Sequence, residues 1–512
     1  MFLLSAVHRK DPPVRLGPTN AKMPQASNGL WWGSRPASLL LLLLLSTLFF
    51  AAESTKKDDG THDVCILGAG SSGMSLAFML KDRNYDVLVI EKEDYVGGHC
   101  NTQRFTGPDG QTAWDDAGVT VFPNTSLANE LGLGPWNIDL IGLFQRFAGP
   151  NSIIPSIFAD TVPFEANLMT GENFGEYIPS FNPLDFFVAL QRLRYLANTT
   201  YRWTDTMIDS PTRIPPELTV PFSQWVVANN FTILGPIFNG TLYAGGYGPL
   251  SDITAFDAIL QAGTSTSLMY DAVPGSWFSV FNGCQSIYDG ITAYLGQDRI
   301  KLNSRVLEVS RPYRGSNQPV VLTGIQNGKR FTARCGQLVV AFPPTPRNIA
   351  FLNPTLIEQA VFGSVTVRDL LLTHVDLAGP LTETGTGFTI INTNPAQPFD
   401  EQTLPAVLSI SRPFFTFGPG HINALADPGI PENQLKQVMA TDAAEAPPAL
   451  LTNVSFNYRY FLHEYNPHFS AQVLEGPISP YLAIDEIQGH QKTFWVGAVR
   501  TTANTASIWN YN

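Results

Sequence analysis

The sequence predicts an α/β protein that contains a Rossmann-like domain, and three observations support this class. A short β-type run at 63–67 is followed by a glycine-rich turn and then by a helical pattern from Met74 to Leu80. A second apolar run at 86–90 ends in an acidic residue. The 512 residues are 44% apolar and 11% aromatic, so the chain can bury a large core.

The glycine-rich turn is the strongest motif in the chain. It reads GAGSSG and contains Gly68, Gly70, Ser71, Ser72 and Gly73. The first glycine permits a tight turn, the second lets the backbone approach a pyrophosphate, and the third lets the helix pack closely on the strand. The positive N-terminus of the helix then faces the phosphates. We therefore expect all five residues to bind a dinucleotide.

The second strand of this unit ends in Glu91, which lies 18 residues beyond the last glycine of the turn. A carboxylate at this place accepts hydrogen bonds from ribose hydroxyls, and its charge repels a 2′-phosphate. The pattern therefore predicts a dinucleotide other than NADP. Strand, turn, helix, second strand and terminal acid are all present, which makes a chance match of the glycines improbable.

Charge and motif content exclude several other classes of protein. There are 31 basic and 43 acidic residues, which give a net charge of −12, so nucleic-acid binding is disfavoured. We find no HExxH, Walker or Ser-His-Asp pattern that would favour a hydrolase or an NTPase. The cysteines, Cys65, Cys100, Cys284 and Cys335, lack metal-ligand spacing and predict neither a metal site nor a disulfide framework. Cys65 is expected to be inert in a buried strand.

The N-terminal residues 1–54 predict a secretory signal peptide. Residues 1–35 carry five basic side chains against one acidic one, and an apolar run at 37–52 follows. Met23 is an alternative start, and an uncleaved anchor is the alternative interpretation. After cleavage we expect no stable membrane span and a protein in the secretory pathway or secreted. Glycosylation is expected at five sequons, which begin at Asn124, Asn198, Asn230, Asn239 and Asn453.

A second glycine turn follows the unit, at Gly97, Gly98 and His99, and it lets backbone N–H groups approach a phosphate. Together with GAGSSG, Glu91 and the later segment DAGV around Gly118, this turn resembles the flavin amine oxidase superfamily. The resemblance is to a secreted fungal and algal branch with β-cyclopiazonate dehydrogenase and polyenoic fatty acid isomerases. It implies FAD, bound without a covalent link, with its phosphates at the second turn.

Scattered later blocks extend the resemblance across most of residues 62–512. The segment LNSRVLEV resembles the strand that meets the adenine, which implies a contact from Val306. The closing block at 487–512 resembles the segment beside the flavin. It implies that Gly497 and Ala498 line the ribityl chain and that residues 502–506 lie at the end of the isoalloxazine ring. A helix N-terminus there would stabilise negative charge on reduced flavin.

The resemblance also implies how the domains are organised. The FAD-binding domain is expected from three discontinuous segments, 62–160, 275–345 and 480–512. An interleaved α+β substrate domain is expected from 161–274 and 346–479. The sequence is compatible with this arrangement, because it shows a helical pattern at 184–196 and β-rich runs at 370–375, 388–391 and 406–410.

The expected activity is that of an FAD-dependent oxidoreductase, which removes a hydride from a small, largely apolar molecule in secondary-metabolite biosynthesis. Two alternatives stay open. One is a redox-neutral isomerase of polyunsaturated fatty acids, for which Arg192, Arg194 or Arg202 could bind the carboxylate. The other is a flavin-binding protein without catalysis. The substrate, the electron acceptor and the oligomeric state are not determined by the sequence.

Four residues are candidates for acid–base or polar contacts with a substrate. His463 and His468 lie in a run rich in aromatic and titratable groups, and their ordinary pKa is near neutrality. Tyr243 and Tyr247 flank a glycine pair and could bind a polar atom of the substrate. Each of the four could equally be a structural residue.

Overall fold

The computed structural model describes the following residues: 60–107, 110, 112–130, 136–156, 161–177, 182–201, 210–261, 275–313, 315–397, 399, 401–412, 418–501 and 505–512. The expected signal peptide at 1–54, Arg202 and residues 502–504 of the closing block lie outside the described residues.

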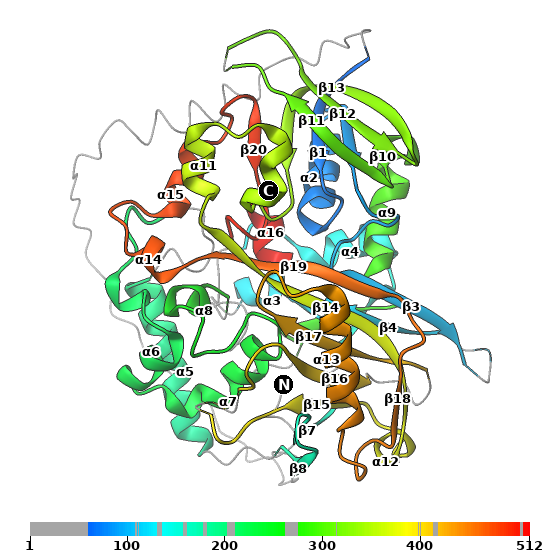
Figure 1. Ribbon diagram of the computed structural model, residues 1–512, viewed down its shortest axis with the longest axis vertical. Helices are drawn as coiled ribbons and strands as arrows, with labels where there is room; N and C mark the ends of the chain where they lie inside the picture. The colour runs from blue at the N-terminus through cyan, green and yellow to red at the C-terminus, as the bar shows by residue number, and fades with distance from the viewer. Residues whose placement is uncertain are drawn as a thin grey trace, which may run out of the picture. The chain divides into compact units, whose positions relative to one another are not determined.

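The first sheet contains the predicted Rossmann-like unit (Figure 1). Its strand order is β10-β2-β1-β13-β12-β11, and β20 pairs with β13. The strands are β1 (Thr61–Leu67), β2 (Val87–Ile90), β10 (Ile300–Lys301), β11 (Ser304–Ser310), β12 (Val320–Gln326), β13 (Lys329–Val340) and β20 (Thr493–Trp495). β1 is parallel to both β2 and β13, whereas β11 and β12 extend the sheet as antiparallel strands. The unit β1–α2–β2 is therefore the predicted strand–helix–strand crossover, with α2 at Ser71–Asp82.

Three further helices accompany the first sheet. They are α4 (Leu140–Ala148), α9 (Gln285–Leu295) and the C-terminal α16 (Thr505–Tyr511). Both α9 and α16 contact α2, and α4 contacts α9. Phe78 of α2 packs on Trp509 of α16, with ring centroids 5.5 Å apart. The end of the chain is therefore packed on the helix that begins at the glycine-rich turn.

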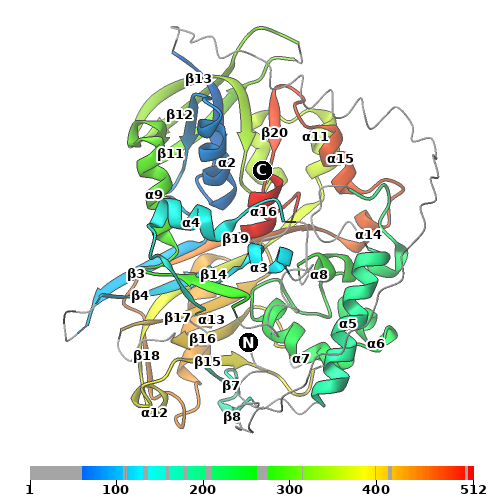
Figure 2. The same ribbon diagram turned by 180° about the vertical axis from the view of Figure 1, so that it is seen from behind.

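The second sheet is formed mainly by the later half of the chain (Figure 2). Its order is β18-β14-β17-β16-β15-β7-β8, and β19 pairs with β14. The strands are β7 (Val162–Asn167), β8 (Glu172–Glu176), β14 (Val365–Ala378), β15 (Phe388–Asn392), β16 (Ala406–Arg412), β17 (Gly420–Ala426), β18 (Asn453–Ser455) and β19 (Tyr460–Phe469). We call this sheet the substrate sheet. Helix α13 (Glu432–Ala444) packs against it and buries Leu435 and Met439.

A two-stranded hairpin lies between the two sheets (Figures 1 and 2). It consists of β3 (Cys100–Thr106) and β4 (Thr112–Gly118), and β4 contacts β14 and β17 of the substrate sheet. A small sheet of β5 (Phe122–Pro123), β9 (Trp277–Val280) and β6 (Ile153–Pro155) follows in the order β5-β9-β6. The remaining helices are α3 (Thr125–Glu130), α5 (Pro183–Thr199), α6 (Phe222–Ala228), α7 (Gly235–Phe238), α8 (Ala255–Gln261), α10 (Pro346–Ile349), α11 (Leu356–Phe362), α12 (Pro380–Glu383), α14 (Ala471–Leu474) and α15 (Pro480–Glu486).

The local predictions agree with these elements. The helix expected at 184–196 is α5, and the β-rich runs fall in β14, β15 and β16. The α/β class is confirmed. The exact limits of the two domains stay a prediction, although the first sheet draws its strands from 61–90, 300–340 and 493–495.

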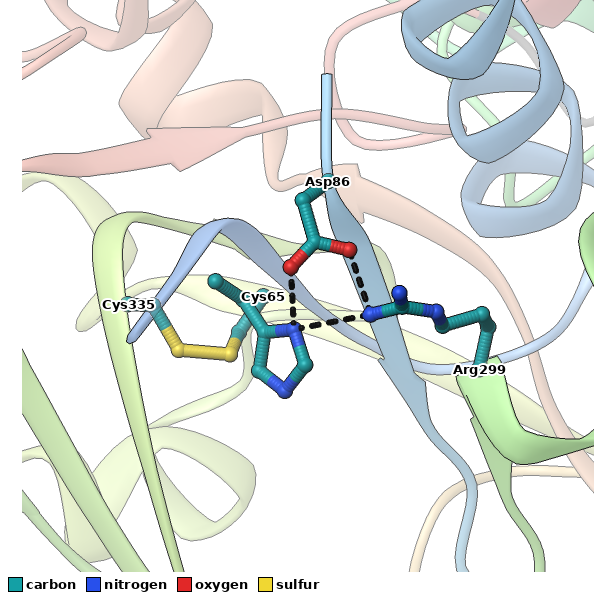
Figure 3. The surroundings of a disulfide bond; sticks show 5 residues. Cys65, Asp86, Arg299 and Cys335 are labelled. Carbon is teal, nitrogen blue, oxygen red and sulfur yellow. Dashed lines mark hydrogen bonds and ion pairs between the residues drawn. A yellow bond between two sulfur atoms is a disulfide. The ribbon is translucent and has the colours of Figure 1, made fainter. Parts of the chain in front are cut away.

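One expectation about the cysteines was wrong. Cys65 is buried in β1 as predicted, but it forms a disulfide with Cys335 in β13, 270 residues further along the chain (Figure 3). Sequence spacing could not indicate this pair, because only the tertiary pairing of β1 with β13 makes the two residues neighbours. Nearby, Asp86 accepts a hydrogen bond from His62 at 2.9 Å and pairs with Arg299 (Figure 3). Cys100 and Cys284 are buried free thiols.

The structure also bears on the surface predictions. Among the described residues, no helix combines the length and the apolar character that a membrane span requires. Asn239 is only 5% exposed, which argues against a glycan at this sequon. Asn230 and Asn453 are exposed, and Asn124 is half-buried. The side chain of Asn198 lies outside the described part of the structure.

Candidate functional site

The glycine-rich turn has the geometry that a dinucleotide requires. Gly68 has a φ of +103°, and a Cβ on Gly73 would lie 1.9 Å from the carbonyl oxygen of Gly68. Only glycine therefore lets α2 start this close to the strand. The N-cap residue Gly70 has no side chain to cap the helix, and the first turn contains no acidic residue. The first N–H groups of α2 are thus available to an anionic ligand.

The second glycine turn lies against the first. The N–H of Gly97 donates to the carbonyl oxygen of Ala69 at 2.8 Å. Gly98 has a φ of +60°, and a Cβ on it would lie 3.0 Å from the Cα of Gly70. Helix α9 fixes the turn, because the Nε2 of Gln285 donates to the carbonyl oxygen of Val96 at 2.8 Å. The two turns expected to hold the phosphates therefore form one backbone cradle with no Cβ atoms at its centre.

Glu91 is 9% exposed and borders this cradle. One of its carboxylate oxygens accepts the N–H of Ala69 at 2.6 Å, and the other accepts the N–H of Glu93 at 2.9 Å. A carboxylate offers about four lone-pair sites, so each oxygen keeps one for a ribose hydroxyl. The backbone carbonyl oxygen of Glu91 accepts the N–H of Ser304 at 2.8 Å, and half-buried Val306 lies two residues further along β11.

The closing block reaches the same cradle from the other end of the chain. Gly497 has a φ of +94°, and a Cβ there would lie 2.7 Å from the Oγ of Ser72. The Nε1 of Trp509 donates to the Oγ of Ser71 at 2.8 Å, and Asn512 donates to the carbonyl oxygen of Ser72 at 3.0 Å. Half-buried Ala498 follows Gly497 directly. The serines of the first turn thus hold the C-terminal helix in place.

The hairpin brings Gly118 to the second turn. Its φ is +107°, and a Cβ on it would lie 2.3 Å from the carbonyl oxygen of His99 and 3.2 Å from the Cδ1 of Leu372. The end of β4 is therefore pressed between the phosphate-binding turn and the substrate sheet. Taken together, the uncapped helix, the cradle without Cβ atoms and the acceptor Glu91 fit the diphosphate and ribose of a dinucleotide such as FAD.

Two of the catalytic candidates lie beside this turn, in a group that we call the neutral cluster: His99, Tyr247, His463 and Tyr465. The ring centroids of His99 are 4.5 Å from His463 and 5.1 Å from Tyr465. Those of Tyr247 and Tyr465 are 5.5 Å apart. Tyr465, which the sequence did not single out, links the two predicted residues.

The histidines of the neutral cluster carry no charge at neutral pH. Burial lowers the pKa of His99 to about 4. Burial, together with the neighbouring His99, also lowers the pKa of His463 well below its ordinary value. The Nδ2 of Asn101 lies 3.1 Å from the Nε2 of His463 and donates to it, so the proton of His463 is on Nδ1. His463 is therefore a neutral donor, and its Nε2 is already occupied.

The other two candidates make different contacts. Tyr243 is fully buried in the same apolar cluster as Tyr465, and its hydroxyl oxygen accepts the N–H of Gln402 at 3.2 Å. The Nδ1 of His468 donates to the carbonyl oxygen of Asn466 at 2.7 Å, and His468 interacts electrostatically with Asp257 of α8. A catalytic role of either residue stays a prediction.

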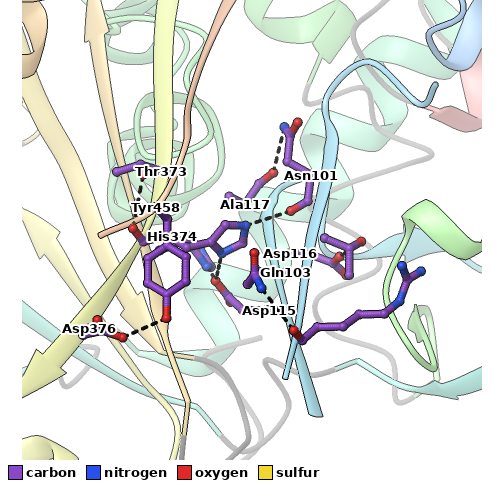
Figure 4. A network of polar contacts seen from close by, with 12 residues as sticks. Asn101, Gln103, Asp115, Asp116, Ala117, Thr373, His374, Asp376 and Tyr458 are labelled. Atoms are coloured by element: carbon purple, nitrogen blue, oxygen red, sulfur yellow. Dashed lines mark hydrogen bonds and ion pairs between the residues drawn. The ribbon is translucent and has the colours of Figure 1, made fainter. Parts of the chain in front are cut away.

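The sequence missed a second polar group, which we call the ionic cluster: Asp115, His374 and His421 (Figure 4 shows the first two). His374 and His421 lie directly opposite each other on β14 and β17. Their Nδ1 atoms lie 2.7 and 2.9 Å from the two carboxylate oxygens of Asp115 on β4. All three residues are at most 7% exposed. No local pattern could reveal the cluster, because its members are more than 250 positions apart or on separate strands.

In the ionic cluster, attraction between the Asp115 carboxylate and its histidines opposes the effect of burial on their pKa values. Burial by itself raises the pKa of Asp115, but the two histidines outweigh it and lower that pKa to about 2. Burial lowers the pKa of His421, yet the Asp115 carboxylate more than compensates and raises it above its ordinary value. The neighbouring Asp116 behaves differently, because burial raises its pKa to about 7.

Comparisons with known proteins agree with this geometry. Residues 66–130 match the model of an NAD(P)-binding Rossmann-like domain. An uncharacterised protein of Acanthamoeba polyphaga mimivirus is 33% identical, covering 88% of this chain and 91% of its own length. An FAD-dependent oxidoreductase of Colletotrichum higginsianum is 28% identical, and the match covers 88% of this chain and 91% of the relative. β-Cyclopiazonate dehydrogenase of Aspergillus flavus is 24% identical, and that match also covers 88% of this chain and 91% of the relative.

Solved structures show the same fold at low identity. A fatty acid isomerase of P. acnes that produces CLA aligns with a TM-score of 0.65 and 15% identity, over 89% of this chain and 98% of its own. Wild-type putrescine oxidase bound to putrescine aligns with a TM-score of 0.56 and 16% identity, and the alignment covers 88% of this chain and 97% of the oxidase. The two-sheet architecture is therefore that of the flavin amine oxidases.

Proposed function

The chain belongs to a family of FAD-dependent oxidoreductases within the flavin amine oxidase superfamily, and we propose that it removes a hydride from a small, largely apolar molecule. When bound, FAD supplies the hydride acceptor. The backbone cradle of the two glycine turns would hold its diphosphate, and Glu91 would hold a ribose. Gly118 and Gly497 border the same cradle.

The observation that carries this proposal is the neutral cluster beside the second turn. His99, His463 and Tyr247 keep part of their surface accessible, although burial is the largest cause of each of their pKa shifts. They would offer a substrate aromatic walls and uncharged hydrogen-bonding groups, and the rings of Tyr247 and Tyr465 contact each other there. Such surroundings suit an apolar substrate better than a charged one.

The isomerase alternative needs a cation for a carboxylate, and the described arginine candidates do not supply it near the cluster. Arg192 of α5 donates to the carbonyl oxygen of Asn229 at 3.1 Å and stacks on Phe231, and its side chain borders an exposed groove. Arg194 lies on the same helix. We therefore rank the dehydrogenase or oxidase first. A role in secondary-metabolite biosynthesis is proposed because β-cyclopiazonate dehydrogenase is among the relatives.

The test is an anaerobic reduction experiment on the protein from residue 55 onward, produced in a secretory host. Amines, terpenoid or polyketide metabolites and unsaturated fatty acids are added in turn while the flavin absorbance is recorded. Lasting bleaching by one class identifies the oxidised substrate, and product without lasting bleaching supports the isomerase. Bound flavin that no class reduces supports a binding protein. Absence of any copurifying or rebinding flavin would refute the proposal.

We also propose that the chain enters the secretory pathway, because residues 1–54 carry the basic segment and apolar run of a signal peptide. Expression of the full chain in a eukaryotic host, followed by N-terminal sequencing and glycosidase treatment, tests this. A start near residue 55 and a mass loss on deglycosylation are expected. An intact N-terminus in the cytosolic fraction would contradict the proposal.

A further inference from the structure

The β3–β4 hairpin links the flavin cradle to the substrate sheet. β3 begins at Cys100, directly after the turn that contains Gly98 and His99. β4 ends at Gly118, which is pressed against the carbonyl oxygen of His99. Any contact that fixes this hairpin therefore also fixes two residues of the expected FAD site.

His374 of the substrate sheet contacts both strands of the hairpin (Figure 4). Its Nδ1 lies 2.7 Å from the Oδ2 of Asp115 on β4, and its Nε2 lies 3.2 Å from the carbonyl oxygen of Asn101 on β3. A backbone carbonyl only accepts hydrogen bonds, and so does an ionised carboxylate. Each ring nitrogen of His374 therefore faces an acceptor on a different strand of the hairpin, and the side chain is only 3% exposed.

We propose that His374 is a positioning residue for the bound flavin: its two ring nitrogens contact β4 and β3, and it fixes the β3–β4 hairpin against the substrate sheet. This proposal rests on FAD binding at the two glycine turns. His374 acts through the hairpin and does not itself contact the cradle. Its effect reaches the cofactor at Gly118 and His99, the residues at the two hairpin ends.

Asn101 connects this contact with the neutral cluster. Its carbonyl oxygen accepts from His374, while its Nδ2 donates to the carbonyl oxygen of Ala117 at 3.2 Å and to the Nε2 of His463 at 3.1 Å. A shift of β3 relative to the substrate sheet would therefore also change the orientation of His463. Asn101 thus links the contact made by His374 to the groups that face the substrate in the proposed function.

The charged and titratable groups around His374 come from several elements. Asp115 and His421 contact each other and lie on β4 and β17. The ring of Tyr458 is 6.0 Å away, and its hydroxyl donates to Asp376 of β14 at 2.9 Å. Asp116 points to the opposite face of β4, where it accepts the N–H of Cys284. Asp115 is therefore the carboxylate that contacts His374.

The test uses the full FAD-loaded chain and two variants. In His374→Asn the amide can replace the Nδ1 contact, and in His374→Gln it can replace the Nε2 contact, but neither side chain holds both strands of the hairpin as the ring does. Asp298, whose side chain is 81% exposed, gives the control Asp298→Asn. The readouts are the FAD dissociation constant from flavin fluorescence, the visible circular dichroism of the flavin, and hydrogen exchange of residues 100–118.

We expect both His374 variants to weaken FAD binding roughly tenfold at pH 6.5, to alter the flavin dichroism and to speed exchange in the hairpin. Asp298→Asn should behave as the wild type. A folded His374 variant with wild-type affinity, dichroism and hairpin exchange would overturn the proposal.

Hydrogen exchange of the wild type covers the case in which the variants do not fold. Protection of residues 100–118 should increase when FAD binds, because the hairpin ends at two residues of the cradle, and protection that is the same with and without FAD would also overturn the proposal. If the wild type binds no FAD at all, the proposed function fails. Hairpin exchange of the His374 variants without FAD distinguishes that result from a failure of the His374 contact, which predicts faster exchange than in the wild type.

Discussion

Two histidine clusters border the β3–β4 hairpin, and burial has opposite results in them. In the ionic cluster, His374 and His421 share the Asp115 carboxylate, so the pKa of Asp115 is lowered and that of His421 is raised. In the neutral cluster, burial is the only cause that lowers the pKa of His99, and no carboxylate contacts its ring among the described residues. The difference teaches that a single carboxylate decides whether a buried histidine here is a fixed ion or an uncharged hydrogen-bonding group.

The largest effect should follow from removal of the shared carboxylate. Asp115→Ala leaves at least one histidine charge buried without its partner, which costs about 3–5 kcal/mol in the free energy of unfolding. Urea denaturation measures this loss. Asp298→Ala is the control, because its side chain is 81% exposed and its replacement should cost less than about 0.5 kcal/mol. Equal losses in the two variants would mean that the ionic cluster has no special role.

The next effect concerns the first glycine turn, on which the cofactor beside the neutral cluster depends. Gly73→Ala places a Cβ 1.9 Å from the oxygen of Gly68, so α2 must move away from the strand. We expect loss of copurifying flavin and a destabilisation of about 1–3 kcal/mol. Gly240→Ala is the control, since a Cβ there meets no atom within 4 Å. Full flavin content in Gly73→Ala would contradict the assigned cradle.

A matched pair of substitutions compares the two clusters directly. His463→Leu removes one hydrogen bond from Asn101, which keeps its bond to Ala117, so the expected cost is about 1.5 kcal/mol or less. His374→Leu leaves a buried carboxylate with one partner fewer, and its cost should be at least about twice as large. Thermal and urea unfolding measure both. A reversed order would show that charge does not distinguish the clusters.

The smallest effect is the dependence of stability on pH, in which the clusters act in opposite directions. The pKa of His421 is raised in the folded state, so its contribution is present below about pH 6.5 and is lost as pH rises through the folded value. The pKa of His99 is lowered to about 4, so stability is lost as pH falls from about 6.5 toward 4.

Unfolding curves between pH 4.5 and 8.5 test both signs. His421→Gln should reduce the loss of unfolding free energy as pH rises. His99→Gln should reduce the loss of unfolding free energy as pH falls. Asp115 adds to the acid side only below about pH 4, because its pKa is about 2 when folded. If the His99→Gln variant loses as much stability below pH 6.5 as the wild type does, this histidine is not buried in a neutral state.

Much of the cofactor site could be predicted, because dinucleotide binding depends on local backbone requirements. Gly68, Gly73 and Gly98 each have a positive φ or a contact that excludes a Cβ, and such positions require glycine, which can be recognised in the sequence. The catalytic candidates stay predictions. His463 and Tyr247 lie in the neutral cluster and Tyr243 packs in the same apolar cluster as Tyr465, whereas His468 interacts with Asp257, and residue type alone does not say which face of an element a side chain occupies.

The sequence by itself determined the α/β class, the strand–turn–helix–strand unit and the carboxylate at its end, because each depends on residues close together in the chain. Only the tertiary structure decided the Cys65–Cys335 disulfide, the partner of Gly497 and the ionic cluster. These contacts join strands that are far apart in sequence. Whether a buried histidine meets a carboxylate depends on how two sheets pack around one hairpin, and no local pattern records that packing.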